Sequence, residues 1–488
     1  MACGKDKVKY MKNTAAIMWF RQDLRLADNP ALAKACEHVT FYPIYIFDPV
    51  ASSGMPMGGA SKVYLHHALK HLQEELGGRL SLYFGDSEAV IKKLIDRYQV
   101  SALYSNIGFE PTCVATDNAI MAYAKERSAQ YIQTNGNYIW HPDAIHKDDK
   151  NPYKVFTPYK RKAMSSSRRA LIPVPNTSSA KKETELSVTL EELALLPKEK
   201  WGKAIASQWE YGEKKAMHKV ETFIKEQLSG YKEGRNHPAK NQTSNISMHL
   251  HFGEVSPTWV YDAVSTTGPQ YANDADIEHY LSELTWREFS INLLRCFPKL
   301  ASANFNPTFD SFPWEENQEF LKKWQEGQTG IPIVDAGMRQ LYQEGYMHNR
   351  VRMITASFLV KNLRLHWRHG FDWFWECLVD ADYANNAAGW QWVAGSGADA
   401  APYFRVFNPI LQGEKFDKDG SYTKKYLPEL SKLPRQYVFK PWEAPGLVLQ
   451  AADVRLGDNY PRPIVDLASS RDQALAAYQL MRGKTKQG

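Results

Sequence analysis

The chain has 488 residues, 43% of them hydrophobic, which is enough for two or three domains with cores of their own and excludes a single small module. Sixty Lys and Arg residues against 54 Asp and Glu give a net charge of +6, a mild basic excess that permits an anionic partner such as nucleic acid without establishing one. No run of eighteen apolar residues occurs and the N-terminus is polar, so we expect a soluble, monomeric, intracellular protein without a membrane partner, cytoplasmic or, in a eukaryote, nuclear.

The cysteines exclude the common metal sites. They are scattered singly, with no C-x-x-C pair, so neither a zinc site nor an iron–sulfur cluster has its usual spacing. We therefore expect no metal, and we expect reduced thiols at Cys3, Cys36, Cys113, Cys296 and Cys377.

Residues 14–145 alternate short β-rich runs with amphipathic stretches, the pattern of an α/β domain with a doubly wound parallel sheet. No glycine lies between Gly4 and Gly54, so the first strand-to-helix turn lacks the G-x-G-x-x-G phosphate motif, and ordinary NAD and ATP enzymes fit poorly. Helices are predicted at about 29–39, 61–77, 87–98 and 113–127. The predicted strands are Ala15–Phe20, Phe41–Phe47, Leu80–Phe84, Ala102–Asn106 and Tyr131–Thr134.

The rest of the chain changes character twice. Residues 146–207 look irregular, with a basic run within 160–169 and a polar stretch at 173–179, and predict a long interdomain linker. From 208 to 480 the periodicity is helical, which predicts a large all-α domain. Eight of the 14 tryptophans fall between residues 286 and 392, which suits an aromatic-lined pocket, an electron path or a large core.

Several motifs occur in an order that carries a family resemblance. Residues 18–30 read MWFRQDLRLADNP, and later motifs are TSNIS at 243–247, ELTWREF at 283–289, GIPIVDAGMR at 330–339, MHNR at 347–350 and GWQW at 389–392. The chain thereby resembles the photolyase/cryptochrome family, and most closely the DNA photolyases that split cyclobutane pyrimidine dimers. The resemblance implies an antenna-binding α/β domain, a linker, a helical catalytic domain that binds FAD, and damaged DNA, duplex or single-stranded, as the partner.

Two stretches are implied to hold the FAD. In the first, hydroxyl groups precede a helical segment and suit a pyrophosphate, although the spacing alone favours a plain helix-capping box. In the second, an arginine–aspartate pair lies beside the flavin ring and an asparagine faces its N5 atom, where an amide favours the fully reduced flavin that repair needs. A structural ion pair and a backbone-bonded asparagine are the plainer alternatives. The implied residues are Tyr231, Arg235, Thr243, Ser244, Ser247, Arg352, Asp380, Asp382 and Asn386.

Two pairs of residues are implied to hold the lesion. Glu283 and Trp286 lie three apart and Asn349 and Met353 four apart, so each pair shares a helical face. By resemblance they line the pocket of the flipped-out dimer, where Trp286 and Trp392 form an aromatic wall and Glu283 and Asn349 hydrogen-bond to base carbonyls. Without the resemblance, core tryptophans and an exposed helical glutamate would be the simpler interpretation.

Five further residues owe their roles to the resemblance alone. Arg350 and Arg405 match positions that grip the phosphates flanking the lesion, and a solvated surface arginine is the alternative for each. Trp390, Trp367 and Trp314 match a series of tryptophans that carries electrons between the flavin and the surface, for which core filling is the alternative.

Other activities on the same scaffold are open alternatives. A cryptochrome photoreceptor shares fold and flavin without repair, but plant-type members usually have tyrosine where Trp392 stands and lack Met353. A (6-4) photolyase uses a histidine pair, whereas this region reads MHNRVRM, and the single-strand-preferring DASH group typically has glutamine at position 353. A light-independent electron-transfer flavoprotein would not need arginines that face DNA.

The antenna pigment is open between a folate and a deazaflavin or flavin. Glu110 falls near the position where folate-binding members place a glutamate, whereas Ser302 stands where some of them have lysine. Ala381 also departs from the family, since many dimer photolyases have glycine there.

Overall fold

The computed structural model describes residues 15–49, 55–197, 200–400 and 404–485, which divide into two compact units. The first unit comprises Met1–Ser229 and Ser244–Pro298, and the second comprises Gly230–Thr243 and Lys299–Gly488. The predicted FAD stretch at 231–247 is therefore shared: its residues up to Thr243 belong to the second unit, and those from Ser244 onward belong to the first.

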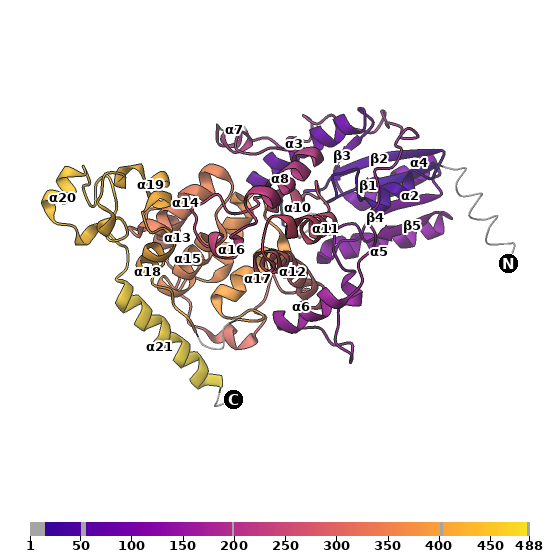
Figure 1. The fold of residues 1–488 in the computed structure, drawn as a ribbon. Helices are drawn as coiled ribbons and strands as arrows, with labels where there is room; N and C mark the ends of the chain where they lie inside the picture. Colours follow the sequence, from indigo (N-terminus) through magenta and orange to yellow (C-terminus); the bar gives the residue numbers. More distant parts are fainter. Residues whose placement is uncertain (1–14, 50–54, 198–199, 401–403, 486–488) are drawn as a thin grey trace. The chain divides into compact units, whose positions relative to one another are not determined.

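A five-stranded parallel sheet forms the core of the first unit (Figure 1), with the strand order β3-β2-β1-β4-β5. β1 pairs with β2 on one side and β4 on the other, so its residues from Ala16 to Phe20 are all buried. The predicted doubly wound sheet is confirmed. Its strands are β1 Ala15–Phe20, β2 Thr40–Phe47, β3 Ser81–Phe84, β4 Ala102–Asn106 and β5 Gln130–Thr134.

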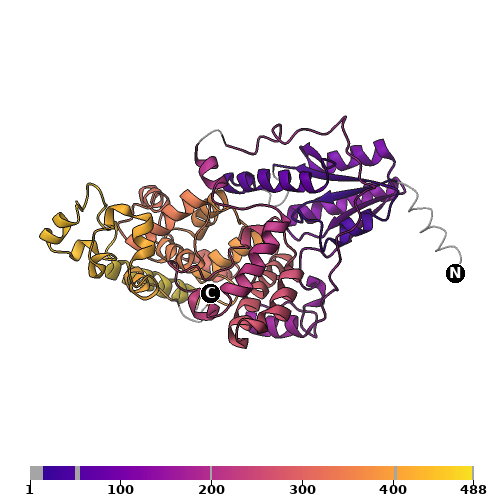
Figure 2. The ribbon, with the colours of Figure 1, turned by 45° about the horizontal axis from the view of Figure 1, so that its top comes forward.

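Helices cover both faces of this sheet (Figures 1 and 2). On one face, Ile17 and Trp19 of β1 pack in one apolar cluster with Ile91 of α4 and Ile120 of α5. Alternate residues of β1 point to the other face, where α2 contacts β1 and β4. α2 is shorter than the predicted 29–39, because the chain must turn before β2 begins. The helices are α2 Pro30–Ala35, α3 Gly59–Glu75, α4 Ser87–Tyr98 and α5 Pro111–Glu126.

The expectation that residues 146–207 are irregular is wrong toward both ends, where helices α6 and α7 form, the latter at Lys200–Ala206. Helix α6, Phe156–Ser165, buries Phe156, Tyr159 and Ala163, whose spacing puts them on one helical face. The basic residues at 160–162 obscured this spacing in the sequence. Between them, residues 166–197 form no helix or strand, and isolated bridges from Ala180 to Phe41 and from Val188 to Leu82 attach them to the sheet strands.

The remaining helices of the first unit lead to α12, which carries two predicted site residues. The Asn273 side chain caps α12 by accepting from Asp276 N at 3.0 Å, and two aspartates in its first turn suit the positive end of the helix dipole. α12 therefore starts at a defined residue. These helices are α7 Lys200–Ala206, α8 Glu213–Glu226, α10 Ser247–His251, α11 Pro257–Thr267 and α12 Asp274–Cys296.

The second unit is built from helices, and the part of it that the structure describes contributes no strand to a sheet. The predicted all-α character is confirmed. α15 continues into a π-helical turn at Phe358–Asn362, and the buried Lys361 in this turn donates to the carbonyl oxygen of Ala394 at 2.7 Å. The helices are α9 Tyr231–Gly234, α13 Gln318–Gln325, α14 Pro332–Glu344, α15 Asn349–Ser357, α16 Trp367–Cys377, α17 Tyr383–Ala394, α18 Pro409–Phe416, α19 Ser421–Tyr426, α20 Gly446–Ala451 and α21 Leu467–Thr485.

Glu288 of α12 is a buried carboxyl group whose ionisation opposes folding. Its Oε2 accepts from Ile139 N at 3.1 Å and its Oε1 lies 2.9 Å from Arg287 Nη1, yet burial outweighs these contacts and raises the pKa of Glu288 from 4.5 to about 7. An acid whose pKa is raised on folding stabilises the native state below its unfolded pKa and loses that contribution as the pH rises through the folded value. Between the unfolded pKa of 4.5 and the folded pKa of about 7, we expect the free energy of unfolding to fall by an amount on the order of 3 kcal/mol.

Glu288→Gln tests this, because glutamine keeps the size of the side chain and removes its titration. Melting temperatures of both proteins should be compared near pH 5 and near pH 8. Relative to the wild type, the variant should be more stable at the higher pH than at the lower one. A difference that stays constant across this range would show that Glu288 ionises as easily in the native as in the unfolded chain.

Candidate functional site

The hydroxyl residues predicted at the flavin phosphates lie at and just before the short helix α10. Ser247 is the first residue of α10, and the capping residue Ile246 offers no side-chain hydrogen bond, so the plain capping box is not formed. Ser244 lies three residues before the helix. Neither serine is used to cap the helix.

α10 also carries a fully buried histidine. His249 Nδ1 lies 2.6 Å from Glu254 Oε2 and 3.0 Å from the hydroxyl oxygen of Tyr64, whereas His249 Nε2 is buried and has no hydrogen-bond partner. Buried polar atoms in native proteins normally have a partner, so an unpaired one two residues after Ser247 points to a ligand or water.

Glu283 and Trp286 lie one turn apart on α12, as predicted. The Trp286 ring stacks on Phe156 of α6, with centroids 3.6 Å apart and planes 7° apart. Glu283 is 31% exposed, and its Oε1 lies 3.8 Å from His279 Nε2 one turn earlier. Phe156, which the sequence analysis did not single out, thus covers one face of the half-buried indole ring, and a further ring could stack only on the other face.

The predicted ion pair between Arg352 and Asp380 is confirmed. Arg352 Nη2 lies 3.1 and 3.0 Å from the two carboxylate oxygens, and Arg352 Nε donates to the Met347 carbonyl oxygen at 2.7 Å. Asp380 is only 4% exposed and Arg352 is 24% exposed, so each charge depends on the other. The guanidinium group lies 5.3 Å from the ring centroid of Tyr346, whose hydroxyl bonds to Thr243, another predicted residue.

Asp382 and Asn386 lie at the start of α17. Asp382 Oδ1 accepts from the backbone and side-chain nitrogens of Asn385, both at 2.7 Å, and so caps the helix. Asn386 Nδ2 donates to the carbonyl oxygen of Phe371 at 3.0 Å. This bond uses one of the two N–H groups of the amide and sets its orientation, and the amide oxygen can accept a hydrogen bond.

The sequence analysis gave no role to a buried histidine beside the arginines of the second unit. His348 Nδ1 accepts from Arg350 N at 3.2 Å and caps α15, so the neutral ring carries its proton on Nε2, which is buried without a partner. Burial and the charges of Arg235, Arg350 and Arg352 lower the pKa of His348 to about 3. The motif at 347–350 contains this histidine, but no periodicity marks it as buried.

Asn349 and Met353 occupy successive turns of α15, as predicted, with Asn349 exposed at its first position. The side chain of Arg350 between them is held in place: Nη2 donates to Asn236 Oδ1 at 2.5 Å, Nη1 lies 3.6 Å from Met353 Sδ, and the guanidinium carbon lies 4.3 Å from the ring centroid of Phe416. This arginine is therefore pre-positioned, unlike a freely solvated one.

The other predicted residues of the second unit differ in exposure. Arg405 is exposed, with its guanidinium group 5.2 Å from the Phe407 ring centroid, and Trp392 is half-buried on α17. Tyr231 is buried at the start of α9, and the Arg235 guanidinium group lies 5.8 Å from its ring centroid.

The three predicted electron-transfer tryptophans run from buried to partly exposed positions. Trp390 and Trp367 are buried, and Trp314 is half-buried. A Cβ on Gly370 would lie 2.0 Å from Trp390 Cη2, so this glycine lets the Trp390 ring press against α16 one turn after Trp367. This order of burial is the one that a path from the interior to the surface requires.

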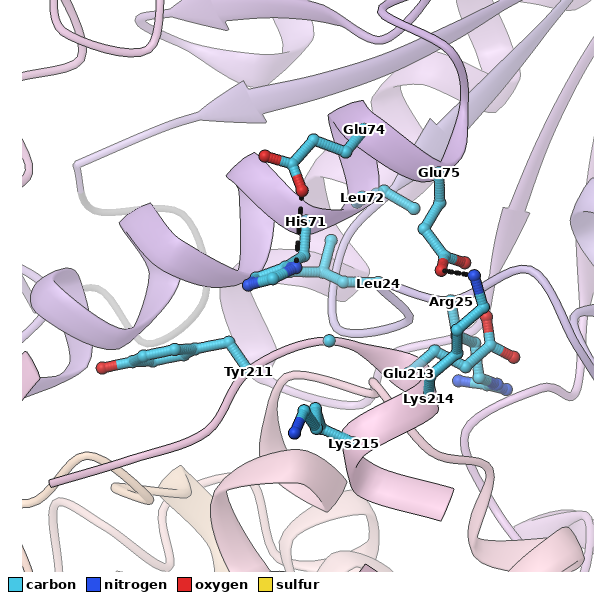
Figure 3. Close-up of a pocket in the computed structure, with 11 residues that line it drawn as sticks. Leu24, Arg25, His71, Leu72, Glu74, Glu75, Tyr211, Glu213, Lys214 and Lys215 are labelled. Carbon is cyan, nitrogen blue, oxygen red and sulfur yellow. Dashed lines mark ion pairs between the residues drawn. The ribbon is translucent and has the colours of Figure 1, made fainter. Parts of the chain in front are cut away.

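A cavity of about 380 Å³ lies elsewhere in the first unit, between α3 and the segment leading into α8 (Figure 3). Its charged groups are largely paired with each other: His71 Nδ1 lies 3.7 Å from Glu74 Oε2, and Lys214 Nζ lies 2.9 Å from Glu75 Oε1. None of the predicted site residues lines it.

The predicted flavin residues fit a large, anionic, hydrogen-bonding cofactor. Each unit holds a buried imidazole nitrogen without a partner, at His249 and at His348, close in sequence to the predicted contacts. The second unit adds an amide oxygen at Asn386 and the charges of Arg235 and Arg352. FAD, with its pyrophosphate and ring carbonyls, suits these donors.

Comparison with known proteins places this site in a family. A family model described as the FAD binding domain of DNA photolyase matches residues 280–480, and another described as DNA photolyase matches residues 16–178. The deoxyribodipyrimidine photo-lyase of Agrobacterium fabrum is 45% identical over 482 residues, which cover 97% of this chain and 100% of the relative. The chain belongs to the DNA photolyase family. The predicted FAD domain and family membership are thereby confirmed.

Two further similar proteins are a photolyase of known structure and a cryptochrome. The crystal structure of a bacterial class III photolyase from Agrobacterium tumefaciens is 44% identical, with a TM-score of 0.92 over 97% of this chain and 98% of that chain. Cryptochrome-2 of Arabidopsis thaliana is 34% identical over 476 residues, which cover 93% of this chain and 77% of the relative. Photolyases and cryptochromes therefore share this scaffold, and the photo-lyase from A. fabrum is the more similar of these two curated relatives.

The described residues contain neither a membrane-spanning helix nor a group of metal ligands. No helix there is long and apolar enough to cross a membrane. Within the same residues, no group of three or more His, Cys, Asp and Glu side chains is arranged to hold a metal ion.

Proposed function

We propose that this photolyase splits cyclobutane pyrimidine dimers in DNA under blue light, with FAD as its electron donor. The observation that supports this most directly is the Asn386 amide, which is held by the Phe371 carbonyl with its acceptor side free to meet an N–H group. An asparagine amide is a poor proton donor, so this residue would favour the fully reduced form of the flavin that repair needs. When bound and reduced, FAD supplies one electron on excitation by light.

The protein's task is to bind and orient this cofactor. Arg352 and Asp380 provide a fixed, neutralised pair beside the ring, and Arg235 with the neighbouring His348 provides positive charge and a donor for anionic oxygens. Tyr231, Thr243 and Asp382 in the second unit, and Ser244 and Ser247 in the first, complete the proposed set of cofactor-binding residues.

The lesion needs an aromatic wall and a few hydrogen-bond donors. Trp286 offers the free face of its ring, and Glu283, when it carries a proton, donates to a base carbonyl and stabilises the negative charge of the electron-accepting dimer. Asn349, Met353 and Trp392 are the proposed contributions of the second unit. Splitting the cyclobutane ring transfers no proton overall, so an amide and a thioether suffice where a proton-transfer reaction would need a titratable group.

Binding the lesion in duplex DNA also requires that it be flipped out. This costs a few kcal/mol, less for a base pair that is already damaged. Arg350 and Arg405 are the proposed phosphate contacts, and the fixed Arg350 side chain loses little conformational entropy when it grips a phosphate. The α/β domain at residues 14–145 is proposed to bind a folate or deazaflavin antenna near Glu110, with residues 146–207 as the linker and 208–480 as the catalytic domain.

Replacing Trp286 by alanine tests the proposed lesion contact. Stacking of a flipped base on an aromatic side chain contributes about 1–3 kcal/mol, so affinity for dimer-containing DNA should fall roughly tenfold or more. Affinity for undamaged DNA should change little, because that DNA presents no flipped base. Both affinities can be measured by titrating labelled oligonucleotides in the dark.

Phe156→Leu is the matched control, because it removes the ring that Trp286 stacks on and keeps the indole. This variant should retain most of the preference for damaged DNA. Equal weakening of both DNAs in Trp286→Ala, reproduced by Phe156→Leu, would instead identify Trp286 as a packing residue.

A further inference from the structure

A histidine lies between two tryptophans of the proposed electron path. The ring centroid of His366 is 5.1 Å from that of Trp314 and 5.5 Å from that of Trp367. Among the ring contacts of the described residues, Trp314 and Trp367 make none with each other. The imidazole of His366 therefore links the two indoles through ring contacts.

The backbone holds this histidine beside Trp314. Glu315 N donates to the Arg364 carbonyl oxygen at 2.8 Å, and Glu315 forms an isolated bridge with Leu365. These contacts fix the residue after Trp314 to the residue before His366. His366 is also the cap of α16: its Nδ1 accepts from Arg368 N at 3.2 Å, which sets the direction of the ring and leaves its proton on Nε2.

Burial and the positive charges beside it keep His366 neutral. His369 and Arg368 face it from its own helix and Asp310 faces it from the preceding 3-10 turn at Pro307–Ser311, while Arg364 is paired with Glu315. Burial, with the charges of His369 and Arg368, lowers the pKa of His366 to about 4. An uncharged ring adds no positive charge that would oppose the formation of a tryptophan radical cation on either side.

We propose that His366 is a positioning residue of the electron path, whose neutral imidazole couples Trp314 to Trp367. The proposal rests on the proposed function, because the path would supply the reduced FAD that repair uses. In the coupled step, Trp314 gives one electron to the Trp367 radical cation, which returns to a neutral indole, and the oxidised Trp314 then releases its indole proton to water. His366 is not the base, because one of its nitrogens accepts the capping bond and the other already carries a proton.

Two substitutions separate the two roles of His366. His366→Asn keeps a side chain that caps helices well and removes the aromatic ring. His366→Phe keeps an aromatic ring and removes the cap. Laser-flash absorption of the FAD-loaded proteins follows the tryptophan radical after excitation, and thermal melting follows stability.

We expect the appearance of the Trp314 radical to slow several-fold in His366→Asn with little change in melting temperature. His366→Phe should keep the wild-type rate and melt at a lower temperature. A wild-type rate in His366→Asn would overturn the role of His366 and leave the proposed function standing. Absence of any tryptophan radical in the wild type would overturn the electron path and the role of His366 together, while dimer repair by chemically reduced protein would still test the proposed function by itself. Dimer repair by all three proteins after chemical reduction also checks that the variants are folded.

Discussion

Replacing Trp367 by phenylalanine abolishes the reduction of bound FAD by blue light. Trp367 is fully buried at the start of α16, its Nε1 donates to Asn304 Oδ1 at 2.9 Å, and Trp390 packs against the same helix at Gly370. Phenylalanine fills most of this space, but its ring is far harder to oxidise than indole. Oxidised Trp390 then has no tryptophan toward the surface that can reduce it. It takes its electron back from the flavin before an external thiol can act.

A repair assay distinguishes the loss of light-driven FAD reduction from damage to the fold. The Trp367→Phe protein, reduced chemically, should split dimers at the wild-type rate, because the tryptophan series is not needed once the cofactor is reduced. Absorption spectra during illumination with a thiol give the first readout, and dimer loss after chemical reduction gives the second.

Trp324→Phe is the matched control. Trp324 is equally buried, its Nε1 donates to the Thr355 carbonyl oxygen at 3.1 Å, and its ring centroid lies 6.1 Å from that of Trp390. This ring contact with Trp390 makes Trp324 the natural competitor for the path. Light-driven reduction should survive this substitution. Loss in Trp324→Phe with retention in Trp367→Phe would move the path to α13.

Replacing Asp380 by asparagine should release FAD and destabilise the second unit. The Asp380 carboxylate is the ion-pair partner of Arg352, and both sit largely out of water. Removing one partner of a buried pair costs 3–5 kcal/mol, and the partial exposure of Arg352 favours the lower end, about 3 kcal/mol. The measurements are the ratio of FAD to protein after purification and the free energy of unfolding of the apoprotein.

Glu315→Gln provides the comparison for an ion pair in the same unit. The pair of Glu315 with Arg364 is 51% and 21% exposed, so its loss should cost no more than about 1 kcal/mol and leave FAD bound. If Asp380→Asn bound FAD normally and unfolded like Glu315→Gln, the Arg352–Asp380 pair would have no special role at the cofactor.

The sequence predicted the sheet closely because parallel strands buried on both faces leave a plain apolar signal. The run at Ala16–Phe20 is one example, and the predicted strands agree with the observed ones to within a residue at each end. Helix α6 was missed for the opposite reason, since the basic residues 160–162 interrupt the apolar spacing of Phe156, Tyr159 and Ala163. A surface helix with so narrow an apolar face resembles a linker in sequence.

The candidate site was predictable only where residues are close along the chain. Helical spacing correctly put Glu283 with Trp286, and Asn349 with Met353. No local pattern could predict that Phe156 stacks on Trp286, because the two residues are 130 positions apart in the chain. Only the resemblance, and not spacing, connected Arg352 with Asp380. Long-range contacts of this kind depend on how helices pack, which a local period does not encode.

Two histidines also show that a local sequence pattern does not reveal how a side chain is buried. His348 and His366 each precede a helix and cap it through Nδ1, a role that the sequence could suggest from position. Their neutrality depends first on burial and then on nearby positive charges: Arg235 approaches His348 from elsewhere in the chain, whereas Arg368 and His369 follow His366 on its own helix. Whether a histidine is a charged surface group or a neutral ring in a packed interior is therefore settled by tertiary structure.

The most direct test of the account is a repair assay that offers two lesions at once. Reduced protein is illuminated with blue light in the presence of oligonucleotides that carry either a cyclobutane dimer or a (6-4) product, and both lesions are quantified by chromatography against a dark control. Opening a (6-4) product needs a proton moved onto a transferring hydroxyl group, a task that Asn349 and Met353 cannot perform. Cyclobutane dimers should therefore disappear in the light while (6-4) products persist. Dimers left intact by a protein that holds reduced FAD would contradict the repair function and favour a cryptochrome-type photoreceptor.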